Sequence, residues 1–365
     1  MSELRSVLIM AGGTGGHVFP GLALAHYMRD QGVQVYWLGT QQGIEVRLVP
    51  EAGFALYCIA IHGLRGKSWG TRLLAPWRLV RALWQSLCLL RQLKPQVVIG
   101  MGGFASGPGG MASWLLGYPL VIHEQNAKAG FTNKILFYFS RKVLTGFPRV
   151  FSKNGKIVMT GNPVRHELME LPPPQERLLS AKPEKSKGEF NLLILGGSLG
   201  AQVLNQVVPK ALARLAIDER PKVYHQAGEK NLAETKKAYM LAGVEGEVVP
   251  FIDEMSKAYG WADMVLCRAG ALTIAELCAV GLGAILVPYP YAVDDHQTAN
   301  ADYMVQHGAA VLISQPQLTE EYLATVIKQL SCNPERRLGM AQAAYGLRNL
   351  GVVEKVFGIL REVSH

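Results

Sequence analysis

The sequence predicts an α/β fold made of two doubly wound parallel sheets, and three observations lead to it. Short apolar runs that end in glycine, such as SVLIMAGG, VVIGMGG and LLILGG, are typical of buried parallel strands followed by tight turns. Stretches of helical length separate the runs, which indicates parallel βαβ units. The length of 365 residues exceeds what one hydrophobic core usually serves, so we expect two domains.

Seven further segments complete the predicted strands. In chain order they are VYWLGT, PLVIHE, KVLTG, KVYHQAG, EVVPFI, MVLCRAG and GAILVPY. The series of strands starts again at Asn191, and the stretch before it, residues 167–190, is rich in proline and charge and is the best candidate for a linker. Ligands of such sheets bind beyond the carboxyl ends of the strands, where the glycine turns lie. We therefore expect two doubly wound domains that face each other over a cleft.

Composition and charge narrow the class of protein. A formal net charge of +9 indicates an acidic partner, such as a phosphorylated substrate, an anionic lipid or a nucleic acid. The five cysteines are scattered without a CxxC pair, which favours free thiols in a reducing cytoplasm. A strand begins almost at the first residue, and no apolar stretch reaches the roughly 20 residues of a membrane span. We expect a cytoplasmic protein without a signal peptide.

Residues 64–94 contain seven basic residues and no acidic one, and this excess accounts for most of the net positive charge of the chain. Pro76 suits the first turn of a helix and Pro95 its stop, which predicts a helix between them. The polar stripe of this helix is predicted to hold Arg78, Arg81, Gln85 and Gln92, and the opposite apolar stripe Val80, Leu83, Leu87 and Leu90.

The same helix is a candidate membrane surface. Trp77 and Trp84 lie on its flank, where indole rings favour a boundary between apolar and aqueous surroundings. Basic amphipathic helices of this composition bind anionic interfaces, so we predict membrane contact. The residues predicted to face the membrane are Arg72, Trp77, Arg78, Arg81 and Trp84. An ordinary basic surface helix is the alternative, and a nucleic-acid site is disfavoured because no common binding module matches.

The first glycine turn, AGGTGGHVFPG, departs from the two common nucleotide motifs. A G-x-G-x-x-G fingerprint that starts at Gly13 would need glycine at Val18, and the Lys-Ser/Thr ending of a P-loop is missing. Its glycines still allow the N–H groups of Thr14, Gly15 and Gly16 to face an anion at a helix N-terminus. The alternative is a tight turn without a ligand.

The second glycine turn, GGSLGA, contains G-x-S-x-G with Ser198 at its centre, which raises the possibility of a serine hydrolase. Asp253 or Asp263 followed by His296 would satisfy the order of a triad. An oxyanion-hole segment of the usual kind is not evident, and short motifs recur by chance. Ser198 is better interpreted as a hydroxyl donor to a phosphate.

The third stretch, CRAGALTIAEL, predicts a strand end, a turn and the start of a helix at Ala271. The N–H groups of that start suit a diphosphate, and Glu276, one turn later, suits the hydroxyls of a ribose. Downstream, Asp294, Asp295, His296 and Gln297 match no common zinc or calcium spacing, so we predict no metal site.

Together with further stretches, these motifs resemble the MurG family of bacterial glycosyltransferases. The matching segments, which span nearly the whole chain, are GGTGGHVFPGLALA, GLRGK, GMGGFASGPGG, HEQNAKAGFTNK, TGNPVR, GGSLGAQVLN, FIDEM, CRAGALTIAEL and VDDHQTANA. The resemblance implies the GT-B glycosyltransferase architecture of two Rossmann-like domains. We place the acceptor and membrane-facing domain at residues 1–164 and the UDP-GlcNAc-binding domain at 165–344, with a C-terminal helix over 345–365 that packs back on the first domain.

The resemblance also implies the reaction and its partners. An enzyme of this family transfers GlcNAc with inversion from UDP-GlcNAc to the C4 hydroxyl of MurNAc in lipid I, which gives lipid II and UDP in peptidoglycan synthesis. Lipid I is a polyprenyl diphosphate in the inner leaflet, so the implied location is peripheral, on the cytoplasmic face of the plasma (inner) membrane. Cell-wall and division proteins are further candidate partners, and nucleic acid is not expected. A UDP-sugar epimerase of the same fold is the alternative function.

The family's donor contacts can be carried over by position. They are Thr14, Gly15, Gly16, Asn126, Arg165, Ser198, Ile252, Ala271, Leu272, Thr273, Ile274, Ala275, Glu276 and Gln297. In this assignment the backbone of Ile252 meets uracil, Glu276 the ribose, and Gln297 the sugar. Ser198 and the helix start bind the diphosphate, and Asn126 reaches GlcNAc from the first domain.

Transfer to a hydroxyl requires a general base with a pKa near neutrality. His17, on the first glycine turn, is the leading candidate, with Glu124 and His123 in second line. The alternative role for His17 is a hydrogen bond to substrate or backbone. Helix-terminal amides and Arg165 suit the charge of a diphosphate leaving group, so we expect no obligatory cofactor, with a divalent cation as an optional aid.

Overall fold

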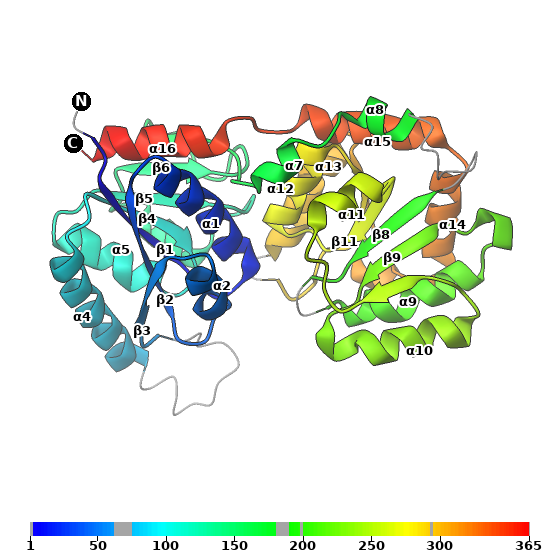
Figure 1. Cartoon of the computed structure of the whole chain (residues 1–365), viewed down its shortest axis with the longest axis horizontal. Helices are drawn as coiled ribbons and strands as arrows, with labels where there is room; N and C mark the ends of the chain where they lie inside the picture. The colour runs from blue at the N-terminus through cyan, green and yellow to red at the C-terminus, as the bar shows by residue number, and fades with distance from the viewer. Residues whose placement is uncertain (1–2, 62–74, 180–189, 198–199, 293–294, 365) are drawn as a thin grey trace. The chain divides into compact units, whose positions relative to one another are not determined.

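The computed structural model describes residues 3–61, 75–179, 190–197, 200–292 and 295–364 (Figure 1). The chain divides into two compact units, here called unit 1 (Met1–Arg165 with Asn349–His365) and unit 2 (His166–Arg348). The boundaries expected from the sequence, after residues 164 and 344, lie one and four residues earlier. Each unit is an α/β domain with one parallel sheet, as the sequence predicted.

Unit 1 contains a seven-stranded sheet in the order β3-β2-β1-β4-β5-β6-β7, and all the neighbouring strands are parallel. Its strands are β1 (Ser6–Ala11), β2 (Gln34–Thr40), β3 (Ala55–Ile59), β4 (Val97–Gly102), β5 (Leu120–Glu124), β6 (Lys142–Thr145) and β7 (Ile157–Met159). Its helices are α1 (Gly15–Asp30), α2 (Glu45–Glu51), α4 (Ala75–Leu93), α5 (Ser106–Leu115), α6 (Phe131–Leu136) and α16 (Val352–Val363).

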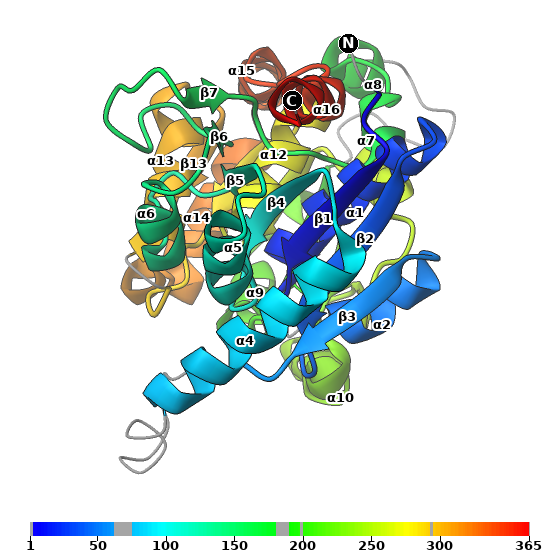
Figure 2. The same cartoon turned by 90° about the vertical axis from the view of Figure 1, so that its left-hand side faces the viewer.

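Alternation along the strands explains why helices cover both faces of this sheet. Val7 and Ile9 belong to the hydrophobic cluster that includes α1 and α16, whereas Leu8 and Met10 belong to the cluster that includes α4, α5 and α6. Successive side chains of a strand point to opposite faces, so β1 is buried on both sides. Figure 2 shows α4 and α5 running across one side of the sheet.

The C-terminal helix is shorter than the predicted range 345–365. Helix α15 (Pro334–Gly346) ends first, and α16 begins only at Val352, because Gly351 adopts a left-handed conformation with φ +62° between them. Within unit 1, α16 packs against α1, and Arg141 Nη1 donates to the carbonyl oxygen of Val363 at 3.2 Å. The last element of the chain therefore completes the core of unit 1.

Unit 2 contains a six-stranded parallel sheet in the order β10-β9-β8-β11-β12-β13. Its strands are β8 (Asn191–Leu195), β9 (Lys222–Gln226), β10 (Glu247–Val249), β11 (Met264–Cys267), β12 (Gly283–Leu286) and β13 (Ala310–Leu312). Its α-helices are α7 (His166–Met169), α8 (Pro174–Leu179), α9 (Gln202–Ala213), α10 (Leu232–Ala242), α11 (Met255–Trp261), α12 (Ala271–Val280), α13 (His296–Gln306), α14 (Glu320–Ser331) and α15. The described residues of unit 2 also include the short 3-10 segments η1 (Ile217–Glu219), η2 (Glu229–Asn231) and η4 (Gln315–Gln317).

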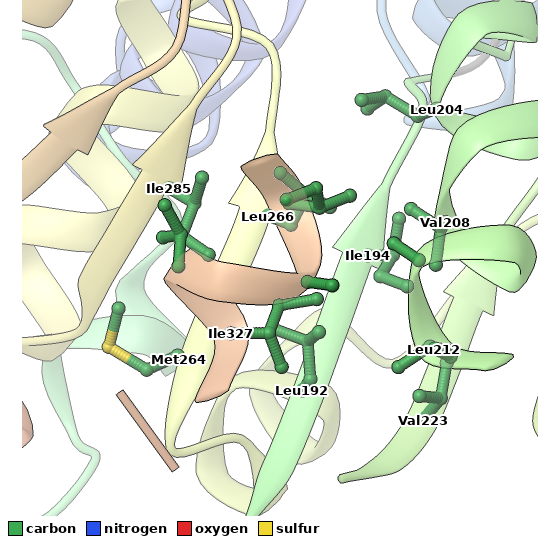
Figure 3. Close-up of a cluster of buried hydrophobic side chains, with 14 of the residues drawn as sticks. Leu192, Ile194, Leu204, Val208, Leu212, Val223, Met264, Leu266, Ile285 and Ile327 are labelled. Atoms are coloured by element: carbon green, nitrogen blue, oxygen red, sulfur yellow. The ribbon is translucent and has the colours of Figure 1, made fainter. Parts of the chain in front are cut away.

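The core of unit 2 lies between its sheet and the helices α9 and α14. Figure 3 shows Leu192 and Ile194 of β8 beside Val208 and Leu212 of α9, with Ile327 of α14 among them. These side chains are at most 1% exposed. The apolar strand runs and the apolar helix stripes therefore meet in one cluster, which is the usual reason that βαβ units fold as one domain.

The segment expected to be a linker, residues 167–190, contains two short helices of unit 2 instead. Its residues 180–189 lie outside the described part of the chain. In α8, the guanidinium of Arg177 is buried and donates to the carbonyl oxygens of Val280 (2.7 Å) and Gly281 (2.6 Å), at the carboxyl end of α12. A cation at that end suits the helix dipole, so α8 is anchored despite its prolines.

The ten predicted strands all form, and three others were missed. These are β3, β7 and β13, each at an edge of its sheet. Edge strands pair on one side only, and β7 and β13 are three residues long, so neither carries a long apolar run. Among the described residues, no helix is long and apolar enough to cross a membrane.

The basic helix α4 forms, and Leu83, Leu87 and Leu90 of the predicted apolar stripe pack in or against the core, but other positions differ from the prediction. The fully buried residues are Ala82, Ser86 and Leu90, whereas Val80 is 57% exposed. Gln85, expected on the solvent side, is half-buried and accepts a 2.9 Å hydrogen bond from the N–H of Ala60. The small residues at 82 and 86 fit where α4 packs on α5, which rotates the apolar Val80 toward solvent.

Candidate active site

The glycine turns lie at the point in each sheet where the strand order reverses. In unit 1 this point falls between β1 and β4, and in unit 2 between β8 and β11. Doubly wound folds bind their ligands beyond the carboxyl ends of the strands at such points. A ligand of each unit is therefore expected at that unit's own switch point.

In unit 1 the turns after β1 and β4 lie directly against each other. A Cβ on Gly103, whose φ is +84°, would overlap the carbonyl oxygen of Gly12. The buried hydroxyl of Ser106 donates to the carbonyl oxygen of Met10 at 3.0 Å and accepts from the N–H of Gly102 at 3.1 Å. These contacts hold the two turns together and explain why the second also needs glycines.

His17 lies in the first turn of α1, half-buried against the second turn. A Cβ on Gly102 would be 2.5 Å from His17 Cδ2 and 2.8 Å from Nε2, so the imidazole rests on that glycine. Nδ1 is 3.5 Å from Thr14 Oγ1. Thr14 is the N-cap residue of α1, but its hydroxyl makes no capping hydrogen bond. The structure thus places the predicted base and the start of the helix at one switch point.

Glu124 ends β5 and is only 3% exposed. Its Oε1 accepts from the backbone N–H (3.1 Å) and side-chain amide (3.2 Å) of Asn126. Its Oε2 accepts from the N–H of Gly130 (3.0 Å) and the amide of Asn133 (2.8 Å). Four donors on a buried carboxylate favour a role in positioning Asn126 over a role as the base.

His123 is wholly buried one residue earlier in β5. Its Nε2 lies 2.9 Å from the carbonyl oxygen of Gly161, which can only accept, so Nε2 carries the proton. Burial lowers the pKa of His123 from 6.5 to about 4. A neutral, buried imidazole that bridges two segments suits structure better than proton transfer from a substrate.

Arg165 is held by an aromatic residue that the sequence interpretation missed. Its guanidinium carbon lies 5.5 Å from the centre of the Phe19 ring. The same ring packs on the start of α1, because a Cβ on Gly15 would be 3.0 Å from Phe19 Cε2. Phe19 therefore brings the predicted diphosphate ligand Arg165 to the helix that carries Thr14 and Gly16. The Phe in the GGHVFPG motif was the available signal.

In unit 2, α12 begins directly after β11 and the turn 268–270, and it contains all the predicted residues from Ala271 to Glu276. Its N-cap, Gly270, has no side chain and cannot itself cap the helix. The side chains of Leu272 and Ile274 are buried, so these two residues can contact a sugar nucleotide only through their backbone atoms. A helix N-terminus with glycine as its N-cap and no acidic residue in its first turn suits an anion.

Glu276 is oriented by a buried tyrosine that sequence reasoning did not single out. The hydroxyl of Tyr259, on α11, donates to Glu276 Oε2 at 2.9 Å. Glu276 is 5% exposed and Tyr259 is fully buried. Nothing in the local sequence links the two residues, because the contact joins two helices.

Ile252 lies in the loop after β10, and its N–H donates to Gln226 Oε1 at 3.2 Å. Gln226 ends β9 and is 4% exposed. The predicted uracil contact at Ile252 thus sits on a backbone that a buried amide holds in place. Gln226 is a second residue that the sequence interpretation missed.

Gln297 lies on α13, and its Oε1 accepts from the N–H of Tyr289 at 2.9 Å. On the same helix, the amide of Asn300 donates to the carbonyl oxygen of Ala269 at 3.1 Å. Arg268 donates to the carbonyl oxygens of residues 287 and 288, both at 3.2 Å. These bonds join α13 and the loop after β12 to the turn that precedes α12.

Ser198 lies outside the described residues, so its contact with a diphosphate stays a prediction. Around it, Gly197 and Gly200 have φ values of +77° and +75°. A Cβ on Gly200 would overlap the carbonyl oxygen of Ala227, so this turn also needs glycine for space. Asn205, on α9, donates to the same carbonyl at 3.0 Å.

The hydrolase alternative conflicts with the position of one proposed acid. Asp263 precedes β11, and its Oδ2 accepts from the N–H of Asn191 at the start of β8. It therefore lies at the opposite end of the parallel strands from the turn that holds Ser198. Among the described residues, no group of three or more His, Cys, Asp or Glu side chains could hold a metal ion.

Comparison with protein families settles the class. The N-terminal domain of glycosyltransferase family 28 matches residues 7–145, and the C-terminal domain of that family matches residues 191–355. The chain belongs to glycosyltransferase family 28. It is a glycosyltransferase with the GT-B architecture that its two parallel-sheet domains indicate.

Relatives that are about 50% identical in sequence match the chain over its full length. A protein of Marinobacter nauticus is 51% identical over 364 residues, which is 100% of this chain and 99% of the relative. One of Nitrosococcus oceani is 50% identical over 98% of each chain. Both are named UDP-N-acetylglucosamine–N-acetylmuramyl-(pentapeptide) pyrophosphoryl-undecaprenol N-acetylglucosamine transferase.

Solved structures agree on the fold. The crystal structure of Acinetobacter baumannii MurG matches with a TM-score of 0.83 and 38% identity, and covers 98% of this chain and 99% of that one. A UDP-N-acetylglucosamine 2-epimerase from Listeria monocytogenes matches with a TM-score of 0.66 at 13% identity, over 99% of this chain and 96% of that one. At that identity the second match shows the fold alone.

Proposed function

We propose that this glycosyltransferase moves GlcNAc from UDP-GlcNAc to the C4 hydroxyl of MurNAc in lipid I, which yields lipid II and UDP. The observation that carries the proposal is the start of α12 at the switch point of unit 2, with a glycine N-cap, no acidic residue in its first turn and the buried carboxylate of Glu276 on the same helix. A diphosphate and a ribose are the groups that this pair suits. The names of the full-length relatives support GlcNAc as the sugar and the lipid-linked MurNAc as the acceptor.

The nucleotide half of the donor would lie on unit 2. Glu276 accepts hydrogen bonds from the ribose hydroxyls, and the backbone of Ile252 meets the uracil. The N–H groups at the start of α12 and the turn around Ser198 face the diphosphate, and Gln297 contacts the sugar. The hydrogen bonds made by Tyr259 and Gln226 support this arrangement, because they hold two of these contacts in place before the donor arrives.

The bond that breaks leaves its electrons on a diphosphate. The acceptor oxygen attacks the anomeric carbon of GlcNAc while the bond from that carbon to the diphosphate oxygen breaks, so one displacement inverts the anomeric centre. Negative charge grows on the leaving UDP. Helix-terminal amides stabilise such charge without reorganisation, and the guanidinium of Arg165 adds a fixed positive charge.

The proton of the acceptor hydroxyl would pass to His17. An imidazole with a pKa near neutrality is suited to this transfer, and His17 lies on the switch point of unit 1 beside Thr14. Glu124 would act through Asn126, since its four hydrogen bonds hold the loop on which Asn126 lies. We place GlcNAc contact on Asn126 and keep Thr14, Gly15 and Gly16 as further substrate contacts.

The membrane face of the enzyme would be the outer side of α4, α5 and α6. Trp77 is 72% exposed, Trp84 64% and Phe131 73%, an unusual density of large apolar side chains on one side of a sheet. Arg78 and Arg81 lie on the same helix as the two tryptophans. Apolar and cationic groups together suit an anionic lipid surface, on the cytoplasmic leaflet that holds lipid I. Arg72 lies outside the described residues.

One assay separates the transferase from the epimerase of the same fold. UDP release is measured with UDP-GlcNAc alone and after addition of a lipid I analogue. The transferase releases UDP in proportion to the analogue and forms a disaccharide product whose anomeric configuration shows inversion. Conversion of UDP-GlcNAc to another UDP-sugar without an acceptor would favour the epimerase and contradict the proposal.

A further inference from the structure

We propose that Glu45, which no motif singled out, is a positioning residue that holds the glycine turn of unit 1 in its working conformation. The proposal rests on the proposed function, because that turn carries His17. Glu45 is the first residue of α2, and its exposed fraction is 0%. Buried carboxylates are costly unless they are fully hydrogen-bonded, so a buried Glu this close to a site requires a physical reason.

Three donors surround the carboxylate of Glu45. Oε2 accepts from the N–H of Gly13 at 2.9 Å, and Oε1 accepts from the N–H and hydroxyl of Thr40 at 2.9 Å and 2.7 Å. Thr40 ends β2, and Gly13 lies in the turn after β1. The carboxylate therefore ties the ends of two neighbouring strands together, and the charge makes each bond stronger than a neutral one.

Neighbouring glycines make room for this side chain. A Cβ on Gly12 or on Gly43 would overlap the carboxylate, and a Cβ on Gly39 would be 2.8 Å from Glu45 Cγ. These three positions, in two turns and one strand, thus need glycine for the same reason: a larger residue would collide with the Glu45 side chain. In the AGGTGG stretch, the first glycine serves an internal carboxylate rather than a ligand.

The bond to Gly13 bears on His17 through the backbone. Gly13 has a φ of +92°, which glycine adopts at no steric cost but also leaves easily. Its amide is fixed by Glu45, and the next residue, Thr14, is the N-cap of the helix that carries His17. A turn that loses this bond can shift the start of α1, and misplacement of a catalytic group by about 1 Å can reduce turnover by about 100-fold.

Glu45 does not itself act on the substrate. Its complete burial and its three donors leave it acting only through the turn. The turn therefore presents the amides from Thr14 onward to a ligand, while the amide of Gly13 is used inside the protein.

The first test is Glu45→Gln, compared with Thr40→Val as the matched control. A glutamine has one acceptor oxygen and one NH₂ group. Its NH₂ group must therefore face an N–H donor, either that of Gly13 or that of Thr40, and the hydrogen bond at that position is lost. Thr40→Val removes one donor of Oε1 but keeps the Gly13 bond. We expect Glu45→Gln to lower the kcat of GlcNAc transfer at least about tenfold, with the KM for UDP-GlcNAc within about twofold of the wild type. Thr40→Val keeps kcat within about twofold.

A second variant and a second readout guard against a general folding defect. Gly43→Ala does not change the identity of Glu45 or Thr40, but its methyl group would occupy the position of Glu45 Oε2 and displace the carboxylate. It should therefore lower kcat in the same way. Amide hydrogen exchange of the segment 12–18 should rise in Glu45→Gln and Gly43→Ala, and stay unchanged in Thr40→Val. This readout does not depend on which reaction the enzyme performs.

The outcomes separate the two proposals. If folded Glu45→Gln keeps wild-type kcat and wild-type exchange at residues 12–18, the positioning role of Glu45 is wrong. If Thr40→Val lowers kcat as much as Glu45→Gln, the carboxylate is only a structural support, which also overturns the proposal. If the wild-type enzyme fails to use the lipid I analogue while the exchange results hold, the proposed function fails and the anchoring of the turn stands.

Discussion

The hydroxyl of Tyr259 donates a 2.9 Å hydrogen bond to Glu276 Oε2, and both side chains are buried. The bond restricts the carboxylate to one rotation about its terminal torsion, which is otherwise broad for Glu. In the proposed function this carboxylate binds the ribose of the donor. Tyr259 would then support donor binding without touching the donor itself.

We therefore expect Tyr259→Phe to raise the KM for UDP-GlcNAc about three- to tenfold, because one hydrogen bond to a charged group contributes about 1.5–3 kcal/mol at most and part of it survives through packing. The kcat should change by less than about twofold. Steady-state kinetics with UDP-GlcNAc and with a 2′-deoxyribose analogue measure the effect. The variant should discriminate less than the wild type between the two donors.

A matched control distinguishes the possible failures. Glu276→Gln removes the charge at the proposed ribose contact and should abolish most of the discrimination. If the wild type itself does not prefer the ribose donor, the assignment of Glu276 is wrong. If Glu276→Gln loses the discrimination between the two donors but Tyr259→Phe keeps that of the wild type, the Tyr259 hydrogen bond supports the fold and not donor binding.

His17→Ala should lower kcat about 100- to 10,000-fold, the usual contribution of a positioned general base. The KM for UDP-GlcNAc should stay close to that of the wild type, because the nucleotide contacts are proposed on unit 2. Turnover with saturating donor and lipid I analogue is the measurement. Near-full turnover by a folded His17→Ala variant would show that another group takes the proton.

The sequence predicted the fold closely because buried parallel strands leave apolar runs that end in glycine. It predicted the surroundings of the motif residues less completely, because a motif gives the positions of residues along the chain and not their hydrogen-bond partners in the fold. Glu45 is bonded to Gly13, 32 residues away, and its own surroundings in the chain give no sign of burial. Tyr259 meets Glu276 only because α11 and α12 fold beside each other.

The orientation of α4 shows a second limit of sequence patterns. Periodicity correctly indicated an amphipathic helix, but it placed Val80 on the buried side, where the structure has Ala82 and Ser86. Helical wheels weigh side chains by polarity, whereas the packing on α5 selects small ones. The exposed Val80 and Leu79 thus enlarge the apolar surface that the sequence attributed to the tryptophans.

This surface leads to a binding prediction. Arg78→Glu with Arg81→Glu should reduce co-sedimentation with vesicles that contain anionic lipid at least about tenfold, since each basic residue near such a surface contributes about 1 kcal/mol. Lys236→Glu with Lys237→Glu on α10 makes the same change in net charge on another exposed helix. That control should bind vesicles like the wild type. Equal loss in both pairs would mean that net charge, not this face, governs binding.

The buried histidines predict that acid destabilises the protein before its carboxylates are protonated. Burial lowers the pKa of His225 from 6.5 to about 3, and that of His123 to about 4. Their folded-state pKa values lie below the unfolded value, so the unfolded chain binds more protons as the pH falls below 6.5. Stability from these two groups is complete above that pH and is lost between pH 6.5 and about 4 for His123, or about 3 for His225.

His225 offers the sharper test of this linkage. Its Nε2 donates to Asn205 Oδ1 and its Nδ1 accepts from the hydroxyl of Tyr239, both at 3.0 Å, so a proton on Nδ1 would force that buried hydroxyl to turn and accept instead. A histidine that stays neutral in the folded state but is protonated in the unfolded state lowers the free energy of unfolding by up to about 1.4 kcal/mol for each pH unit in this window. Urea denaturation at pH 7, 6 and 5 should show this slope in the wild type and a smaller one in His225→Gln. An unchanged slope in the variant would mean that His225 does not remain neutral in the fold.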